Sequence, residues 1–164
     1  MKNVIVPGKS EDMHACCKIL EKSELGKVYF SDKSPRRMLS KALEKGEIYV
    51  ALDDQRKCIG FIFFELRGTF GKYPYLHMIV VDENFRGKGI GKELIRYFED
   101  VITEDYDKVF LLVGDFNKRA KTLYQKLGYE KLGVLSNFYT QGVQEYLMGK
   151  YKDQEVKLSH DGFK

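Results

Sequence analysis

The chain has 164 residues, of which 43% are hydrophobic, 13% aromatic and 32% charged. This length fits one globular domain, and the composition excludes a disordered or collagen-like chain. The 28 Lys and Arg residues outnumber the 24 Asp and Glu residues, giving a net charge of +4, but the two signs are interleaved along the chain, which disfavours a protein dedicated to nucleic acid.

Apolar segments and cysteines indicate the compartment and whether a metal site is expected. No apolar run approaches the roughly 18 to 20 residues of a membrane span, and the first residues lack the apolar core of a signal peptide. Cys16, Cys17 and Cys58 have no metal-ligand spacing and predict reduced, mostly buried thiols. We therefore expect a cytoplasmic protein with no metal ion, no nucleic-acid partner and no membrane partner. One domain is predicted over 1–151, followed by a polar tail at 152–164.

The first predicted elements are a short strand at 4–6 and a helix that follows it. Ser10 precedes two acidic residues, which is typical of a helix N-cap because carboxylates are favoured near the positive end of the helix dipole. Apolar residues then recur at the spacing of one buried helix face. They are Met13, Cys16, Cys17 and Leu20.

A second helix and three strands come next. Ser34 and Pro35 are typical of the N-cap and first position of a helix, which Gly46 ends. Strands are predicted at 48–52, 58–66 and 75–81, with the polar turn 53–56 joining the first two into a hairpin. The third strand has no polar alternation, as expected when both faces of a sheet are covered.

The second half alternates strands and helices. A glycine-rich turn leads into a helix, a strand is predicted at 109–113, and Asn117 caps a further helix that Gly128 ends. The last strands are predicted at 129–135 and 143–150. The apolar face of the first of these helices is predicted to consist of Ile90, Leu94, Tyr97, Phe98 and Val101. This element order predicts an α/β domain with a mixed sheet.

The glycine-rich turn carries the clearest functional signal. Three alternating glycines between a strand and a helix allow a ligand to approach the backbone, and the first amides of the helix suit a phosphate. A tight structural turn is the alternative. The dinucleotide pattern GxGxxG fails because Lys92 stands where the last glycine is needed, and a P-loop fails because Glu93 follows Gly91-Lys92. The glycines and neighbouring cations are Arg86, Gly87, Lys88, Gly89, Gly91 and Lys92.

Two blocks of sequence resemble a known family. Residues 86–91, Arg-Gly-Lys-Gly-Ile-Gly, match every defining position of the motif (Q/R)xxGx(G/A), and residues 117–129 look like NxxAxxLYxKLGF. The chain thus resembles the GNAT superfamily of acyl-CoA-dependent N-acyltransferases over about 48–150, whereas 1–47 fit only the variable part that shapes the acceptor site. The resemblance implies a single-domain GNAT fold, a mixed sheet flanked by helices with splayed central strands, and acetyl-CoA as donor.

The resemblance also implies a set of residues that contact acetyl-CoA. The backbone of the glycine-rich turn would hold the pyrophosphate, and the preceding strand would bond the pantetheine arm and polarise the thioester. The implied cofactor-binding residues are Ile79, Val80, Val81, Arg86, Gly87, Lys88, Gly89, Ile90, Gly91, Asn117 and Tyr124.

Tyr124 is the candidate acid. Seven residues separate it from Asn117, so both lie on nearly the same helix face. An amine that attacks a thioester expels a thiolate, and a tyrosine, with an unperturbed pKa of about 10 against about 8.5 for a thiol, can protonate it. The alternatives are a core aromatic role for Tyr124 and a purely capping role for Asn117.

The general base is less well determined. Related sequences often carry Glu where this chain has Tyr75, so the usual base is missing. Two candidates remain: Glu65 on the preceding strand, and His77, which lies on the same side of its strand as Tyr75. A chain of water molecules is the further alternative. The predicted function is an N-acetyltransferase acting on a small-molecule or protein amine, with a homodimer as the commonest assembly. A non-catalytic acyl-CoA-binding module is the alternative, and an anion or nucleic-acid binder is a third.

Overall fold

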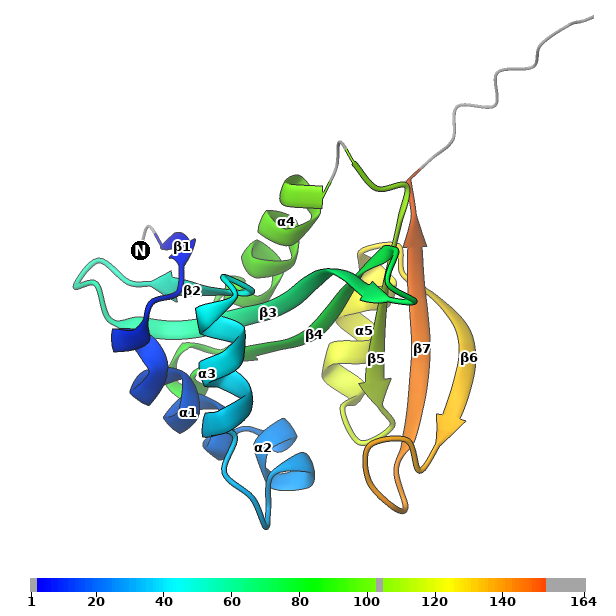
Figure 1. Cartoon of the computed structure of the whole chain (residues 1–164), viewed down its shortest axis with the longest axis horizontal. Coiled ribbons are helices and arrows are strands. Elements are labelled where there is room, and N and C mark those ends of the chain that lie inside the picture. Colours follow the sequence, from blue (N-terminus) through cyan, green and yellow to red (C-terminus); the bar gives the residue numbers. More distant parts are fainter. Residues whose placement is uncertain (1–2, 103–104, 153–164) are drawn as a thin grey trace, which may run out of the picture.

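The computed structural model describes residues 3–102 and 105–152, so nearly all of the predicted tail lies outside the described residues. Figure 1 shows one sheet with helices on both faces. In chain order the elements are β1 (Val4–Pro7), η1 (Ser10–Asp12), α1 (Met13–Lys22), α2 (Glu24–Tyr29), α3 (Arg36–Glu44), β2 (Ile48–Leu52), β3 (Cys58–Thr69), β4 (Tyr73–Val81), η2 (Glu83–Phe85), α4 (Ile90–Ile102), β5 (Lys108–Gly114), α5 (Lys118–Lys126), β6 (Glu130–Ser136) and β7 (Gln144–Tyr151), where η marks a 3-10 turn.

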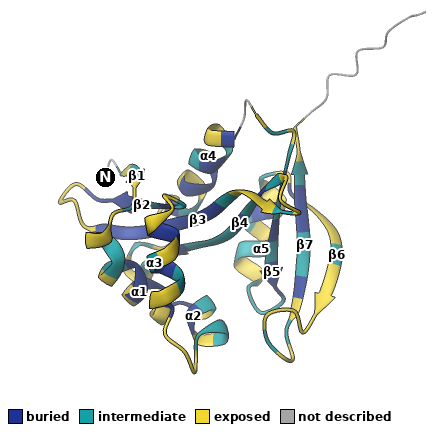
Figure 2. Ribbon diagram, viewed as in Figure 1, coloured by how far each residue is buried: buried dark blue, intermediate teal, exposed yellow. Residues whose placement is uncertain are grey.

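The strands form a single sheet in the order β1-β2-β3-β4-β5-β7-β6. Every neighbouring pair is antiparallel except β4 and β5, which are parallel and are connected through α4. The predicted α/β domain with a mixed sheet is therefore confirmed. Figure 2 shows that the central strands are the buried ones, whereas β6 is exposed along most of its length at the sheet edge.

The two parallel strands separate soon after they meet. β4 pairs with β5 only at Tyr75–Phe110 and Leu76–Leu111, although β4 runs on to Val81 and β5 to Gly114 (Figure 1). The predicted splay of the central strands is confirmed. Beyond Leu76, the edge of β4 that points toward β5 has no strand partner among the described residues, so its backbone groups are available to a ligand.

The sheet separates two apolar layers. On one face, α1 and α3 pack residues such as Leu20 and Leu39 against Phe61, and we call this the α1–α3 face. On the other, α4 and α5 pack Leu94 and Tyr124 among the core residues of β3, β4 and β5, and we call this the α4–α5 face. Cys16, Cys17 and Cys58 are free and buried, as predicted. No helix in the described ranges has the length and apolar character needed to cross a membrane.

Several local predictions were wrong. Ser10 is the first residue of η1 rather than an N-cap, because the Asp12 carboxylate takes the capping role and accepts a hydrogen bond from the Lys9 amide at 2.8 Å. Val101 is 42% exposed, since the buried face of α4 turns through Ile95 and Ile102 instead.

Helix boundaries also differ. The sequence pattern missed α2, a helix too short for a periodic signal, which Ser23 caps by accepting a hydrogen bond from the Gly26 amide at 3.0 Å. α3 begins at Arg36, one residue later than predicted, with Pro35 just before it. Its end is as predicted, because Gly46 adopts a φ of 71°.

Candidate active site

A β-bulge in β4 arranges the residues at the point where the strands separate. Phe63 pairs with Met78 and Phe64 with Leu76, so His77 is an extra residue with no direct partner on β3. His77 lies on the α1–α3 face, where its ring stacks on Phe63 at 4.2 Å and meets the Tyr75 ring edge-on at 4.6 Å. The prediction that His77 and Tyr75 share a side is therefore confirmed.

The two predicted base candidates lie together. The His77 Nε2 atom is 3.0 Å from Glu65 Oε1, and both side chains remain partly exposed, at 27% and 33%. Burial lowers the pKa of His77 below its ordinary 6.5, although the Glu65 carboxylate acts in the opposite direction. Glu65 also pairs directly with Tyr75 across β3 and β4, so it supplies a carboxylate opposite the position where the family resemblance leads us to expect Glu.

A network of hydroxyls extends from this dyad across the opening between the strands. The Tyr75 and Tyr139 hydroxyl oxygens are 2.8 Å apart, and the rings of Tyr139 and Tyr29 meet edge-on at 5.8 Å. The Tyr29 hydroxyl donates a hydrogen bond to Glu145 Oε1 at 2.5 Å. The network thus joins β4, the loop 137–143, α2 and β7 on the α1–α3 face.

Gly114 gives Tyr29 its place in this network. A Cβ atom at Gly114 would stand 2.7 Å from the Tyr29 hydroxyl and would also clash with the Phe116 ring. Glycine at the end of β5 therefore lets the Tyr29 hydroxyl lie against the strand backbone beside Glu145, which pairs with Gly114. Sequence reasoning missed Tyr29 and Glu145, because 116 residues separate them and neither lies in a motif.

The glycine-rich turn has the geometry of an anion cradle. Gly87 and Gly89 have φ values of 81° and 86°, and a Cβ atom on either would meet nothing within 4 Å. No group in the described part of the chain accepts a hydrogen bond from the backbone amides of 87–91. The Arg86 side chain folds back, and its Nε donates to the Val81 carbonyl at 3.2 Å, which ties the turn to the end of β4.

α5 brings the second sequence block to the same end of β4. Asn117 caps this helix by accepting a hydrogen bond from the Ala120 amide at 3.2 Å, which confirms its predicted capping role and leaves its contact with a cofactor a prediction. A Cβ atom at Gly91 would lie 3.8 Å from the Leu123 side chain and 4.0 Å from that of Val81. The start of α4, the end of β4 and α5 therefore converge.

Tyr124 is buried at this convergence on the α4–α5 face. It is 7% exposed and meets the Tyr129 ring edge-on at 5.7 Å. Burial raises the pKa of Tyr124, so its hydroxyl is protonated at neutral pH. The core role that sequence reasoning set against the acid role is confirmed, and the acid role stays a prediction.

These features fit a ligand with an anionic group and an extended arm. The anion would lie against the amides of the turn, the arm along the free edge of β4, and the reactive end in the opening between β4 and β5. That opening gives a ligand held on the α4–α5 face access to the hydroxyl network on the α1–α3 face. Among the described residues, no three His, Cys, Asp or Glu side chains gather as metal ligands would.

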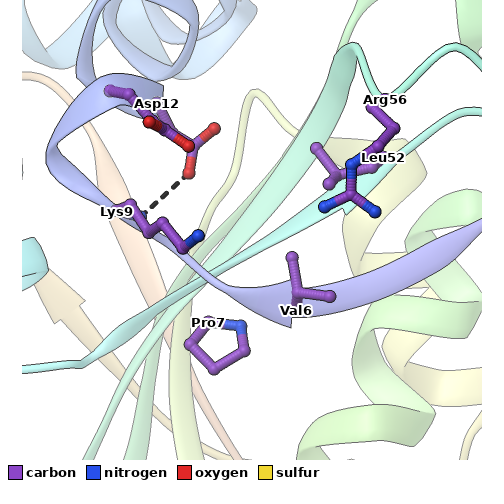
Figure 3. A pocket seen from close by; sticks show the side chains of 7 residues that line it. Val6, Pro7, Lys9, Asp12, Leu52 and Arg56 are labelled. Atoms are coloured by element: carbon purple, nitrogen blue, oxygen red, sulfur yellow. Dashed lines mark hydrogen bonds between the residues drawn. The ribbon is translucent and has the colours of Figure 1, made fainter.

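A hollow of about 280 Å³ lies elsewhere, along β1 and the loop that follows it (Figure 3). Its lining includes Val6, Lys9, Asp12 and Arg56. Asp12 already accepts the hydrogen bond from the Lys9 amide that Figure 3 marks. None of the predicted site residues borders this hollow, so we do not assign the chemistry to it.

Comparison with known proteins agrees with this geometry. The family model described as Acetyltransferase (GNAT) family matches residues 13–129. A prophage-derived uncharacterized N-acetyltransferase of Bacillus subtilis, YokL, is 34% identical over 122 residues, covering 68% of this chain and 65% of that protein, slightly less than two thirds. An N-alpha-acetyltransferase of Saccharolobus solfataricus is 35% identical over 113 residues, covering 62% of this chain and 67% of that protein.

The fold has close structural likenesses as well. The crystal structure of Ard1 from Thermoplasma volcanium superposes with a TM-score of 0.78 at 20% sequence identity, covering 94% of this chain and 100% of that one. At this identity the likeness concerns the fold. The structural match also includes the elements before residue 48, to which the sequence motifs did not extend.

Proposed function

This chain belongs to the GNAT acetyltransferase family, and we propose that it is an N-acetyltransferase that moves an acetyl group from acetyl-CoA to a primary amine by direct attack in a ternary complex. The observation that carries the proposal is the opening between β4 and β5. It has an anion cradle and a protonated tyrosine on one face and a cluster of acids, an imidazole and hydroxyls on the other. We assign the activity to the domain predicted over 1–151.

Acetyl-CoA supplies the acetyl group as a thioester. The turn amides of 86–91 would hold its pyrophosphate, and the free edge of Ile79, Val80 and Val81 would hold its pantetheine arm. Val81 has fewer free backbone groups for the pantetheine arm than Ile79 and Val80, because its carbonyl already accepts a hydrogen bond from Arg86. Asn117 and Tyr124 would complete this side of the site.

Two proton movements are assigned to this chain's own groups. The Tyr124 hydroxyl gives its proton to the departing sulfur, and a base on the α1–α3 face takes a proton from the acceptor nitrogen. Glu65 and His77 are the predicted bases. The lowered pKa of His77 keeps its imidazole unprotonated at neutral pH, which a base requires.

For the acceptor, we infer the α-amine of a peptide. The name of the Saccharolobus solfataricus relative supports this class, and so does the 50% exposure of Tyr139, through which the hydroxyl network reaches the surface. Glu65 supplies a carboxylate opposite Tyr75, which supports the catalytic interpretation over the non-catalytic alternative. The homodimer and the exclusion of nucleic acid stay predictions.

The test is acetyl transfer to the tetrapeptide amide Met-Ala-Gly-Ser, followed by release of the CoA thiol and by the mass of the product. The matched control is the same peptide with its α-amine already acetylated and with an added lysine, which offers only a side-chain amine. Spermidine is the second control and represents small polyamines. Transfer to the free α-amine with little transfer to the two controls supports the proposal. Transfer only to lysine or spermidine refutes the α-amine class, and no transfer to any amine refutes the activity.

A further inference from the structure

Glu145 is a buried carboxylate for which the proposed function has no use so far. It is 1% exposed, near the start of β7. The titratable groups that face it are Tyr29 from α2, Tyr139 from the loop 137–143, Asp115 after β5 and Tyr75 from β4. Within 3–102 and 105–152, no Lys, Arg or His forms an ion pair with it.

A buried carboxylate without a cation is energetically unfavourable. Charged groups inside proteins are normally paired, because removal from water is expensive for the ionised form. Burial accordingly raises the pKa of Glu145 and the nearby Asp115 adds to this, whereas the hydrogen bond from Tyr29 lowers it. Glu145 is therefore a group that gains stability by taking up a proton or meeting a cation.

The position of Glu145 connects it to the reaction. It lies opposite Gly114, at the end of the strand that borders the opening. Tyr29, whose hydroxyl donates a hydrogen bond to Glu145, is partly exposed, and its ring contacts that of Tyr139, which is 50% exposed. An ammonium group that approaches the opening from this face meets the Tyr29 hydroxyl before it meets Glu145.

Resting on the proposed function, we propose that Tyr29 and Glu145 form a proton relay that receives the acceptor's ammonium group and makes its amine free to attack. The ammonium nitrogen gives one proton to the Tyr29 hydroxyl oxygen while Tyr29 gives its own proton to Glu145 Oε1. One N–H bond and one O–H bond break, two O–H bonds form, and the products are a neutral amine and a neutral carboxyl group. Glu145 acts through Tyr29 and does not touch the acceptor.

The relay differs from the Glu65–His77 dyad in its consequence for pH. A free peptide α-amine has a pKa of about 7.7 to 8.0, so an enzyme that needs the amine already neutral works poorly below that range. An enzyme that accepts the ammonium form keeps working below pH 7 until Glu145 itself is protonated. The dependence of kcat/KM on pH therefore reports on the relay.

The experiment measures kcat/KM for the Met-Ala-Gly-Ser amide between pH 5.5 and 9.5 in the parent, Glu145→Gln, Tyr29→Phe and the double variant. We expect each single variant to lose roughly 100-fold at pH 6 and less than about 5-fold at pH 9.5, where the amine arrives neutral. The double variant should lose no more than either single one, because the two residues act as one unit. Glu130→Gln, an exposed change at the start of β6, is the control and should match the parent.

Glu65→Gln is measured in the same way. Three results would overturn the relay. They are a loss of equal size at every pH, which indicates structural damage, no loss at all, and a pH-dependent loss in Glu65→Gln that is absent from Glu145→Gln. Acetyl-CoA affinity and melting temperature are measured for each variant. If the parent itself transfers no acetyl group, the proposed function fails, whereas a fully active Glu145→Gln with an unchanged pH profile refutes only the relay.

A second readout needs no acetyl transfer. Protein labelled with carbon-13 at the glutamate carboxyl groups is titrated by NMR, and the Glu145 signal is identified by its loss in Glu145→Gln. Adding the free peptide should lower the pKa of Glu145, since a nearby cation favours the carboxylate, and the acetylated peptide should leave it unchanged. A Glu145 titration that does not change on adding the free peptide contradicts the relay, whatever the acetyl-transfer activity of Glu145→Gln.

Discussion

Tyr124 is a core residue whose hydroxyl is also the proposed acid. Its ring packs in the apolar layer of the α4–α5 face with Tyr129, while its position beside the end of β4 makes its hydroxyl the proposed acid. Spacing alone favoured the core role, and only the family block favoured the acid. The structure confirms the core role of the ring, and the acid role is a separate proposal about the hydroxyl.

The change Tyr124→Phe separates the two roles. Turnover should fall by roughly 100-fold or more, because the proton for the departing sulfur is lost, while the retained ring keeps the fold and acetyl-CoA affinity within about 2-fold of the parent. The measurements are kcat, a calorimetric Kd and a melting curve. Tyr129→Phe removes a hydroxyl from the same cluster and is the matched control. Equal turnover in Tyr124→Phe and the parent would eliminate Tyr124 as the acid.

Residue-level prediction succeeded where residues lie in one motif or on one strand, and failed where the fold brings distant residues together. His77 and Tyr75 lie two residues apart on β4, so alternation correctly predicted that they share a side. Tyr29 and Glu145 belong to an unpredicted short helix and to the last strand, and no local pattern relates them. The burial of the Glu145 carboxylate could not be predicted, because it depends on residues that are distant in the sequence.

At the scale of elements, the glycine-rich turn depends on backbone conformation more than on side-chain contacts. Gly89 has a positive φ and open space in front of it, so its substitution is strained by conformation alone. The turn was predicted correctly from sequence because strand, glycines and helix follow one another directly. The β-bulge at His77 was not predicted, because its position depends on pairing with β3.

We expect Gly89→Ala to lower the free energy of unfolding by about 1 to 2 kcal/mol, the usual penalty for a side chain in the left-handed region, and to weaken acetyl-CoA binding. Gly133→Ala is the matched control: its Cβ also meets nothing within 4 Å, but its φ lies outside the left-handed region. Urea unfolding and calorimetry measure both variants. The idea fails if Gly89→Ala binds acetyl-CoA as tightly as Gly133→Ala does.

At the scale of the whole molecule, the fold consists of two apolar layers on a sheet that opens in its middle. The alternation of strands and helices predicted the mixed sheet, and the resemblance predicted the opening between β4 and β5. Which strand lies at which edge could not be read from the sequence, because hydrophobic patterns do not specify the order β5-β7-β6. The exposed edge strand β6 looks like any other amphipathic segment in sequence.

The pH dependence of global stability should carry the signature of His77. Its pKa is lowered in the folded protein, so below its ordinary 6.5 the unfolded chain binds the proton first, and stability falls as pH decreases below that value. Between pH 7.5 and 5.5 the parent should lose more free energy of unfolding than His77→Gln, by at most about 1.4 kcal/mol per pH unit.

Urea unfolding of both proteins at several pH values checks this. Glu47 and Glu145, whose pKa values are raised by burial, contribute equally to both proteins and cancel in the comparison. Parallel curves for the parent and His77→Gln would mean that the imidazole is not held in its neutral form by the fold.

The most direct test of the central claim is a calorimetric titration of the purified protein with acetyl-CoA, with ATP and NAD as controls. The anion cradle, the free edge of β4 and the opening beside Tyr124 together predict selective binding of acetyl-CoA at one site per chain. Absence of binding, or equal binding of ATP and NAD, would contradict the assignment of this site to acetyl-CoA and with it the proposed acetyl transfer.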